Sequence, residues 1–153
     1  MKHEVLLLGK IKDSFIAAGV DEYLGRLKHY TKAELRYLKP KGKRGNVLTP
    51  EQEGDLLLSS AAEGSLLVAL DVQGKMLSSE GLSEQISRFE NAGTKTVSYL
   101  IGGPLGLSKE VLARADVRLS FSKMTFTHDM VRLLLIEQLY RAYTIKAGEK
   151  YHK

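Results

Sequence analysis

Short apolar runs separated by turn residues are the clearest pattern in this chain. One run extends from Val5 to Leu8 and is closed by Gly9, and similar runs fall at 65–70 and 96–101. Continuous apolar runs of this length, without polar alternation, are typical of strands covered on both faces in a parallel sheet. Two weaker segments, Ala33 to Leu38 and Val117 to Phe121, complete the predicted set of strands.

Helical periodicity appears between these runs, where apolar residues recur three or four positions apart. One such stripe is formed by Ile16, Val20, Tyr23, Leu27 and Tyr30, and another by Leu82, Ile86 and Phe89. A short helix is also predicted from Lys109 to Ala115.

A further helix is marked by its first residues. Thr49 suits the N-cap, Pro50 the first helical position and Gln52 the third, which together make a capping box. Strands and helices therefore alternate along the 153 residues. This order predicts an α/β fold, a mostly parallel sheet with right-handed crossovers and helices on both faces, in a single domain over residues 1–153.

A glycine-rich turn follows the run at 96–101. Gly102, Gly103, Pro104 and Gly106 lead to Ser108, which is a suitable N-cap for the next helix. Glycines let the backbone approach a bound group closely, and ligands of open α/β sheets lie at the carboxyl ends of strands. The turn is therefore either a ligand-binding loop or a plain chain reversal, which is the commoner use of such turns.

The last helix, predicted from about Asp129 to Thr144, is apolar over far more than one face. In a small protein such a helix is either threaded through the core or forms half of an oligomer interface. The amount of apolar surface on the segment from Val131 to Tyr143 predicts a symmetric homodimer.

Composition narrows the possible partners. Lys and Arg total 23 against 18 acidic residues, giving a net charge of +5, which suits a polyanion such as nucleic acid or a merely soluble basic protein. There is no cysteine, and the four histidines lack metal-ligand spacing, so we expect neither a disulfide nor a metal site. The short apolar run at the N-terminus predicts a core strand and not a signal peptide, and no segment is long enough to span a membrane. A cytoplasmic protein is expected.

A basic loop lies between the second predicted strand and the capping box. The segment from Lys39 to Gly45 carries four cations, Lys39, Lys41, Lys43 and Arg44, and no acid. Such a loop is either a solvated turn or a contact for nucleic-acid phosphates.

Three common enzyme classes do not fit the motifs. The glycines are not the G-x-G-x-x-G that follows the first strand of dinucleotide-binding folds. No serine lies in a G-x-S-x-G elbow, and no G-K-[ST] follows a glycine loop.

Four motifs carry a resemblance to a known family. They are L-D-V-Q-G-K at 70–75, I-G-G-P-L-G-L-S at 101–108, L-S-F-S-K-M-T-F-T-H at 119–128 and V-R-L-L-L-I-E-Q-L-Y-R-A-Y at 131–143. In this order they resemble the SPOUT-class RNA methyltransferases. Within that class the whole chain is similar to the RlmH family, which methylates N3 of a pseudouridine in the 23S rRNA of the large ribosomal subunit.

The resemblance implies a fold and a cofactor. Members have a C-terminal deep trefoil knot, act as homodimers and hold S-adenosylmethionine inside the knot. The positions that match the family's cofactor loops are Leu70, Gly102, Gly103, Ser122, Lys123, Met124, Thr125 and Phe126. On the substrate side it implies Arg132, Arg141 and the tail residues Tyr151 and His152, where the tail of one subunit reaches the cofactor pocket of its partner.

The chemistry needs little dedicated machinery, because a sulfonium methyl is already activated and transfer depends mainly on orientation. The imide of pseudouridine must lose a proton, and His128 and His152 are candidates to accept it. His128 is equally suited to capping the last helix beside Asp129, and His152 to binding substrate. A non-catalytic ribosome-binding factor and a SPOUT enzyme for another RNA base stay open as alternatives.

Overall fold

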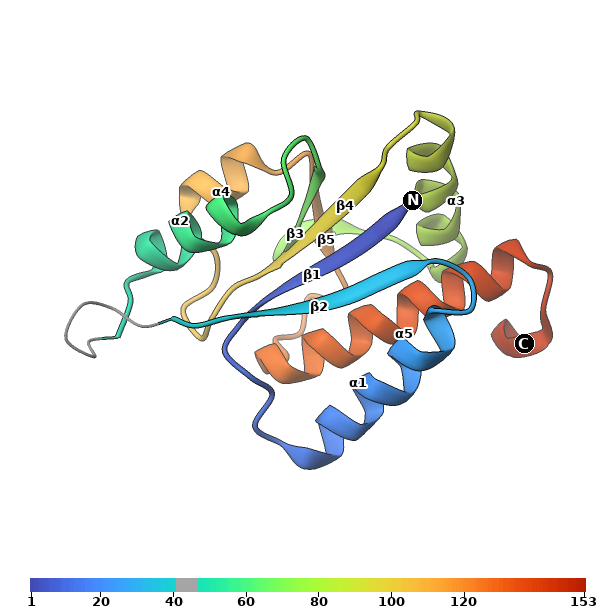
Figure 1. The fold of residues 1–153 in the computed structure, drawn as a ribbon, viewed down its shortest axis with the longest axis horizontal. Helices are drawn as coiled ribbons and strands as arrows, with labels where there is room; N and C mark the ends of the chain where they lie inside the picture. The colour runs from blue at the N-terminus through green and yellow to red at the C-terminus, as the bar shows by residue number, and fades with distance from the viewer. Residues whose placement is uncertain (41–46) are drawn as a thin grey trace.

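The computed structural model describes residues 1–40 and 47–153. Five parallel strands form one sheet in the order β2-β1-β4-β3-β5. Helices and strands alternate along the chain (Figure 1). Their bounds are β1 Lys2–Leu8, α1 Ser14–Leu27, β2 Lys32–Leu38, α2 Pro50–Ser60, β3 Leu66–Met76, α3 Ser79–Asn91, β4 Thr96–Ile101, α4 Lys109–Arg114, β5 Val117–Ser120, α5 His128–Lys146 and the 3-10 helix η2 Lys150–His152. The predicted α/β fold is confirmed, while the trefoil knot stays a prediction.

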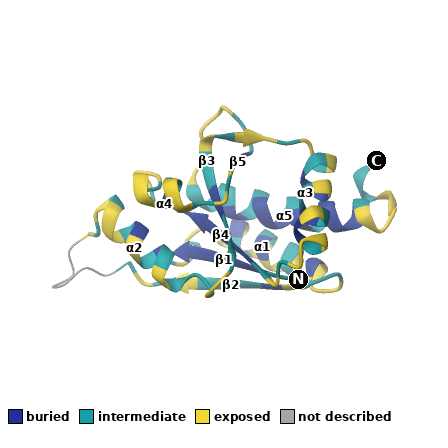
Figure 2. Cartoon of the chain, turned by 90° about the horizontal axis from the view of Figure 1, so that it is seen from above, coloured by how far each residue is buried: buried dark blue, intermediate teal, exposed yellow. Residues whose placement is uncertain are grey.

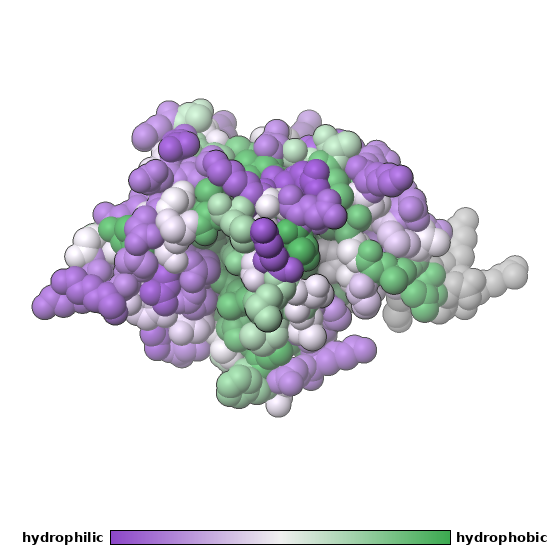
Figure 3. All heavy atoms as spheres, turned by 180° about the vertical axis from the view of Figure 1, so that it is seen from behind, coloured by the Kyte–Doolittle hydropathy of each residue, from purple (hydrophilic) through white to green (hydrophobic). Residues whose placement is uncertain are grey.

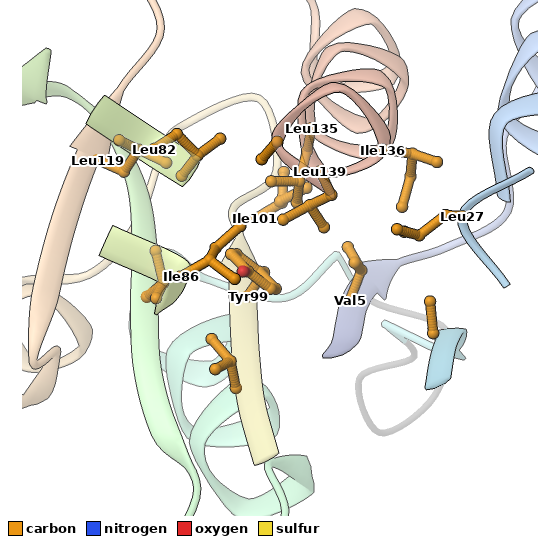
Figure 4. Packing of buried hydrophobic residues seen from close by; sticks show 14 of the residues in the cluster. Val5, Leu27, Leu82, Ile86, Tyr99, Ile101, Leu119, Leu135, Ile136 and Leu139 are labelled. Carbon is orange, nitrogen blue, oxygen red and sulfur yellow. The ribbon is translucent and has the colours of Figure 1, made fainter. Parts of the chain in front are cut away.

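The sheet is covered on both faces, as its apolar strands require (Figure 2). Alternate residues of β1 serve the two faces: Val5 and Leu7 pack with the α1, α3 and α5 side, whereas Leu6 and Leu8 pack with α2 and α4. Figure 4 shows the larger core, in which the aliphatic side chains of α5 meet those of the sheet. The two-sided burial explains why β1 has no polar alternation in its second half.

Helix α5 lies against α1 and α3 of its own chain. No side chain between His128 and Ile145 is exposed, and Leu135, Ile136 and Leu139 are fully buried. Much of the helix's apolar surface is therefore covered within the chain, as the core alternative predicts.

Strand β3 differs from its predicted form. The sequence predicts a strand over 65–70, but β3 continues to Met76, and both Leu70 and Lys75 are in register with Leu119 of β5. The residues between them form an irregularity in the strand. Gly74 makes this possible, because a Cβ there would lie 2.7 Å from the backbone carbon of Arg118.

A buried polar network lies between β1, β4 and α5. His3 is fully buried, with Nδ1 3.0 Å from Tyr99 Oη and Nε2 2.9 Å from Tyr143 Oη. Because Tyr143 Oη donates its one proton to Glu90, it accepts from Nε2–H, and Tyr99 donates to Nδ1. This arrangement satisfies a neutral imidazole.

The network predicts an acid-sensitive fold. Burial is the largest cause that lowers the pKa of His3, from 6.5 to about 4. Between those values the unfolded chain binds a proton that the folded chain does not, so stability is full above pH 6.5 and falls as the pH falls toward 4. We expect the free energy of unfolding, measured in urea, to be about 2 kcal/mol lower at pH 5 than at pH 7.5.

The variant His3→Gln is the test of this assignment, and His29→Gln, at an exposed histidine, is its control. His3→Gln should make the free energy of unfolding nearly independent of pH between about 5 and 7.5, and His29→Gln should leave the wild-type pH dependence unchanged. If His3→Gln loses as much stability on acidification as the wild-type protein, a group other than His3 causes the acid sensitivity.

Candidate active site

A cleft of about 510 Å³ lies beyond the carboxyl-terminal ends of β4 and of the regular part of β3. Its walls come from three segments that are far apart in the sequence. They are Leu70 and Val72 of β3, Ile101 to Gly103 with Pro104, Gly106 and Leu107 after β4, and Thr125 to His128 with Val131 before and within α5. A smaller adjoining hollow of about 70 Å³ shares Leu70 and Phe126 and adds Ser122 and Met124. The cofactor loops predicted from the sequence therefore meet at one place.

A larger hollow, of about 730 Å³, lies at the opposite end of the strands, around the segment 28–34. None of the four sequence motifs contributes to its lining. The cleft beside the glycine turn is the candidate site because the motifs converge there. It lies at the carboxyl ends of the strands, where ligands of parallel α/β folds bind.

The glycine turn is tightly closed. The N–H of Gly106 donates to the carbonyl of Gly103 over 3.0 Å, and Gly106 has φ +81°, in the left-handed region. A Cβ on Gly102 would lie 2.7 Å from the backbone carbonyl of Gly106. Gly102 is thus required by the turn itself, which presents its backbone to the cleft.

Gly103 has a different close neighbour, which sequence reasoning missed. A Cβ there would lie 2.8 and 2.9 Å from the two carboxylate oxygens of Glu53 on α2. Burial raises the pKa of Glu53, while a hydrogen bond from the N–H of Gly103 and the nearby His128 act in the opposite direction. The sequence marks Glu53 only as an acid in the first turn of a helix, with no sign of its partner.

The loop from Phe121 to Thr127 forms the other wall. Ser122 Oγ accepts from the N–H of Met124 over 3.0 Å, which holds the loop in a turn. The side chains of Met124 and Phe126 are 74% and 38% exposed, so apolar surface is available at the mouth of the cleft. Lys123 is exposed in the same loop and does not line the cleft.

His128 is the first residue of α5 and lines the cleft. It does not cap the helix: Thr127 is the N-cap, and its hydroxyl accepts from the N–H of Met130. His128 Nε2 lies 3.6 Å from the carboxylate of Asp129. The imidazole therefore belongs to the wall of the cleft and lies beside a carboxylate.

Arg132 is not available to RNA, contrary to the expectation from the sequence. Its side chain is 1% exposed, Nη1 pairs with Asp129 over 2.8 Å, and Nη2 donates to the carbonyl of Leu8 over 2.8 Å. Burial lowers its pKa. Arg132 thus ties α5 to the end of β1, a role that an arginine in a sequence does not reveal because most arginines are exposed.

The tail folds back on α5 and does not line the cleft of its own chain. Tyr151 Oη donates to Glu137 over 3.0 Å, and the guanidinium of Arg141 lies 4.7 Å from the centre of the Tyr151 ring. His152 Nε2 lies 2.6 Å from Glu80 of α3. Glu137 and Arg141 lie in the middle and the second half of α5, so the tail packs against this part of the helix and not against its first turn, where His128 lies (Figure 1).

Lys41, Lys43 and Arg44 lie outside the described residues. Among the residues that are described, no group of three or more acidic or histidine side chains is placed to hold a metal ion. In the same part of the chain, no helix is long and apolar enough to cross a membrane.

Residues 1–152 match the family model described as "Predicted SPOUT methyltransferase", and the chain belongs to this family. It is therefore a methyltransferase, and the non-catalytic alternative no longer holds. Similar proteins include the "Ribosomal RNA large subunit methyltransferase H" of Desulfotalea psychrophila, 76% identical over 153 residues. Proteins of the same name from Halothermothrix orenii and Clostridioides difficile are each 43% identical over 159 aligned residues. Each alignment covers the whole of both chains.

Proposed function

We propose that this methyltransferase transfers a methyl group from S-adenosylmethionine to N3 of a pseudouridine in the 23S rRNA of the large ribosomal subunit. The observation that carries the proposal is the convergence of Leu70, the glycine turn and the 121–127 loop on one cleft. The relatives' name, which refers to large-subunit ribosomal RNA, supports this choice of substrate.

The cleft fits the proposed cofactor in size and lining. Its volume of about 510 Å³ lies within the usual range for small-molecule sites, and Leu70, Ile101 and Phe126 offer apolar walls for an adenine ring. The glycines of the turn place backbone groups in the cleft wall, beside the side chains of Pro104 and Leu107. When bound, the cofactor supplies a methyl group on a sulfonium, which a nucleophile takes in line without a covalent enzyme intermediate.

The protein's own contribution is orientation, exclusion of water and acceptance of one proton. N3 of the pseudouridine gains the methyl group and loses its proton, which we assign to the imidazole of His128 at the cleft wall. The exposed side chains of Met124 and Phe126 would pack against the bases and displace water as the site closes.

Tyr151 and His152 would act on the cleft of a second copy. Their position away from their own cleft, held by Arg141, Glu137 and Glu80, supports a homodimer in which each tail completes the partner's site. An apolar band across the back face, flanked by hydrophilic side chains, is the kind of surface that a second copy would cover (Figure 3).

Light scattering is expected to give twice the chain mass of 17.0 kDa at micromolar concentration. Two neighbouring leucines of α5 offer a matched test. Leu134 is half-buried and Leu135 is fully buried. Leu134→Glu should release folded monomers, whereas Leu135→Glu should unfold the protein because it places a charge in the core. A folded wild-type monomer at that concentration would contradict the shared site.

RNA docking is assigned to the basic loop with Lys41, Lys43 and Arg44, and to Arg141 beside the tail. The net charge of +5 supports a polyanionic partner. Ribosomes are the substrate in this proposal, which places the enzyme in the cytoplasm.

Nucleoside analysis tests the proposed product. Ribosomes that lack the modification are incubated with the protein and S-adenosylmethionine, the RNA is digested, and the nucleosides are separated by mass. The expected product is N3-methylpseudouridine. A methyl group on another base would favour the alternative of a SPOUT enzyme with a different target.

A further inference from the structure

Helix α2 is in contact with both ends of the glycine turn through two adjacent residues. The carboxylate of Glu53 lies against Gly103, where a Cβ would come within 2.8 Å of Oε2. The next residue, Gly54, is buried against the N-cap of α4, and a Cβ there would overlap Ser108 Oγ and lie 3.0 Å from a methyl of Val111. The absence of a side chain at Gly54 lets the end of the turn approach α2, and this approach places Glu53 beside the start of the turn.

The carboxylate is matched to a backbone group of the turn. Its oxygens lie next to Gly103, and the N–H of this residue stabilises the charged form of Glu53, which opposes the rise in the pKa of its carboxyl. A charged acceptor on a backbone N–H is among the stronger hydrogen bonds of a protein. Glu53 does not itself line the cleft, so its effect on a ligand must pass through the turn.

From these contacts we infer that Glu53 is a positioning residue, which holds the turn from Gly102 to Gly106 in the shape that receives the methyl donor. The inference rests on the proposed function for the identity of the ligand. A helix with an acid in its first turn gains stability from the helix dipole alone, so this ordinary role must be separated from the proposed one. Glu51 provides the comparison, because it lies in the same first turn and is exposed.

Three variants are compared with the wild-type protein: Glu53→Ala, Glu53→Gln and Glu51→Ala. Binding of S-adenosylhomocysteine, the demethylated cofactor, is measured by calorimetry. Hydrogen exchange of the amides at 102–108 is measured without ligand. Glu53→Ala should weaken binding about tenfold and speed exchange of the Gly103 amide, because its acceptor is lost. In Glu53→Gln the amide oxygen still accepts this bond, so affinity should return to within about threefold of wild type. Glu51→Ala should change neither quantity.

The outcomes separate the inference from the proposed function. A wild-type protein that binds no S-adenosylhomocysteine contradicts the proposed cofactor, while the exchange rates still test the contact with Gly103. Wild-type affinity and exchange in Glu53→Ala would overturn the inference. Equal losses in Glu53→Ala and Glu53→Gln would overturn the role as hydrogen-bond acceptor. Equal losses of affinity in Glu53→Ala and Glu51→Ala would show that Glu53 acts only through its interaction with the helix dipole.

Discussion

Replacing Gly102 with alanine is expected to weaken binding of S-adenosylmethionine by about 10- to 100-fold while the protein stays folded. The added Cβ would lie 2.7 Å from the carbonyl group of Gly106 and 3.0 Å from the N–H nitrogen of Leu107. Both neighbours are backbone, so the overlap is relieved only by opening the turn. The turn lies outside the two hydrophobic clusters, and for this reason binding should suffer more than folding.

Gly25 is the matched control for this substitution. It is an exposed helical glycine with no atom within 4 Å of an added Cβ, so Gly25→Ala should keep full affinity and slightly raise the melting temperature. Calorimetry and thermal unfolding of both variants make the comparison. Full affinity in Gly102→Ala would show that the shape of the turn does not matter to the ligand, and the cleft would lose its main support as the cofactor site.

Deleting residues 151–153 is expected to lower methyl transfer at saturating ribosomes by about a hundredfold or more, with cofactor affinity unchanged. In the proposed dimer Tyr151 and His152 orient the target base in the partner's cleft, so their loss affects turnover and not only binding. The glycine turn and the 121–127 loop, to which the cofactor is assigned, are intact in the truncated protein, so cofactor affinity should persist.

Removal of Lys153 alone is the control for this truncation, since that residue is exposed and its side chain makes no hydrogen bond or ion pair among the described residues. The shorter truncation should behave as wild type. Thermal unfolding checks that loss of the Tyr151 ring from its place beside Tyr140 has not unfolded the helix end. If the enzyme without 151–153 reaches full turnover at higher ribosome concentration, the tail only docks the substrate, and neither residue belongs among the catalytic groups.

Patterns among neighbouring residues were sufficient to predict most of the strands and helices. The apolar run from Val5 to Leu8 lies in a buried central strand, and the capping box is present, with Thr49 Oγ1 accepting from Gln52 N over 3.2 Å. Both features depend on neighbours in the sequence. The bulged continuation of β3 was missed because it depends on β5, whose backbone closely approaches Gly74.

Only the part of the candidate site that lies within recognisable sequence motifs could be predicted. Leu70, Gly102 and Phe126 line the cleft as expected, because the ends of parallel strands meet at one edge of a sheet. Arg132 and Glu53 show the limit. Each has the residue type of a surface position, and each takes its role from partners far away in the sequence, Leu8 for the first and Gly103 for the second. Such partners follow from the packing of helices and cannot be deduced from local periodicity.

Transfer of a tritiated methyl group from S-adenosylmethionine is the most direct test of the central claim, that the cleft between the glycine turn and α5 methylates ribosomal RNA. The purified protein is incubated with ribosomes and, separately, with free rRNA, and Gly102→Ala and Gly25→Ala are assayed in parallel. Radioactivity is expected to enter the large-subunit RNA of ribosomes, to be strongly reduced with Gly102→Ala and to be unchanged with Gly25→Ala. No transfer by the wild-type protein to either substrate, or equal transfer by both glycine variants, would contradict the assignment of the reaction to this cleft.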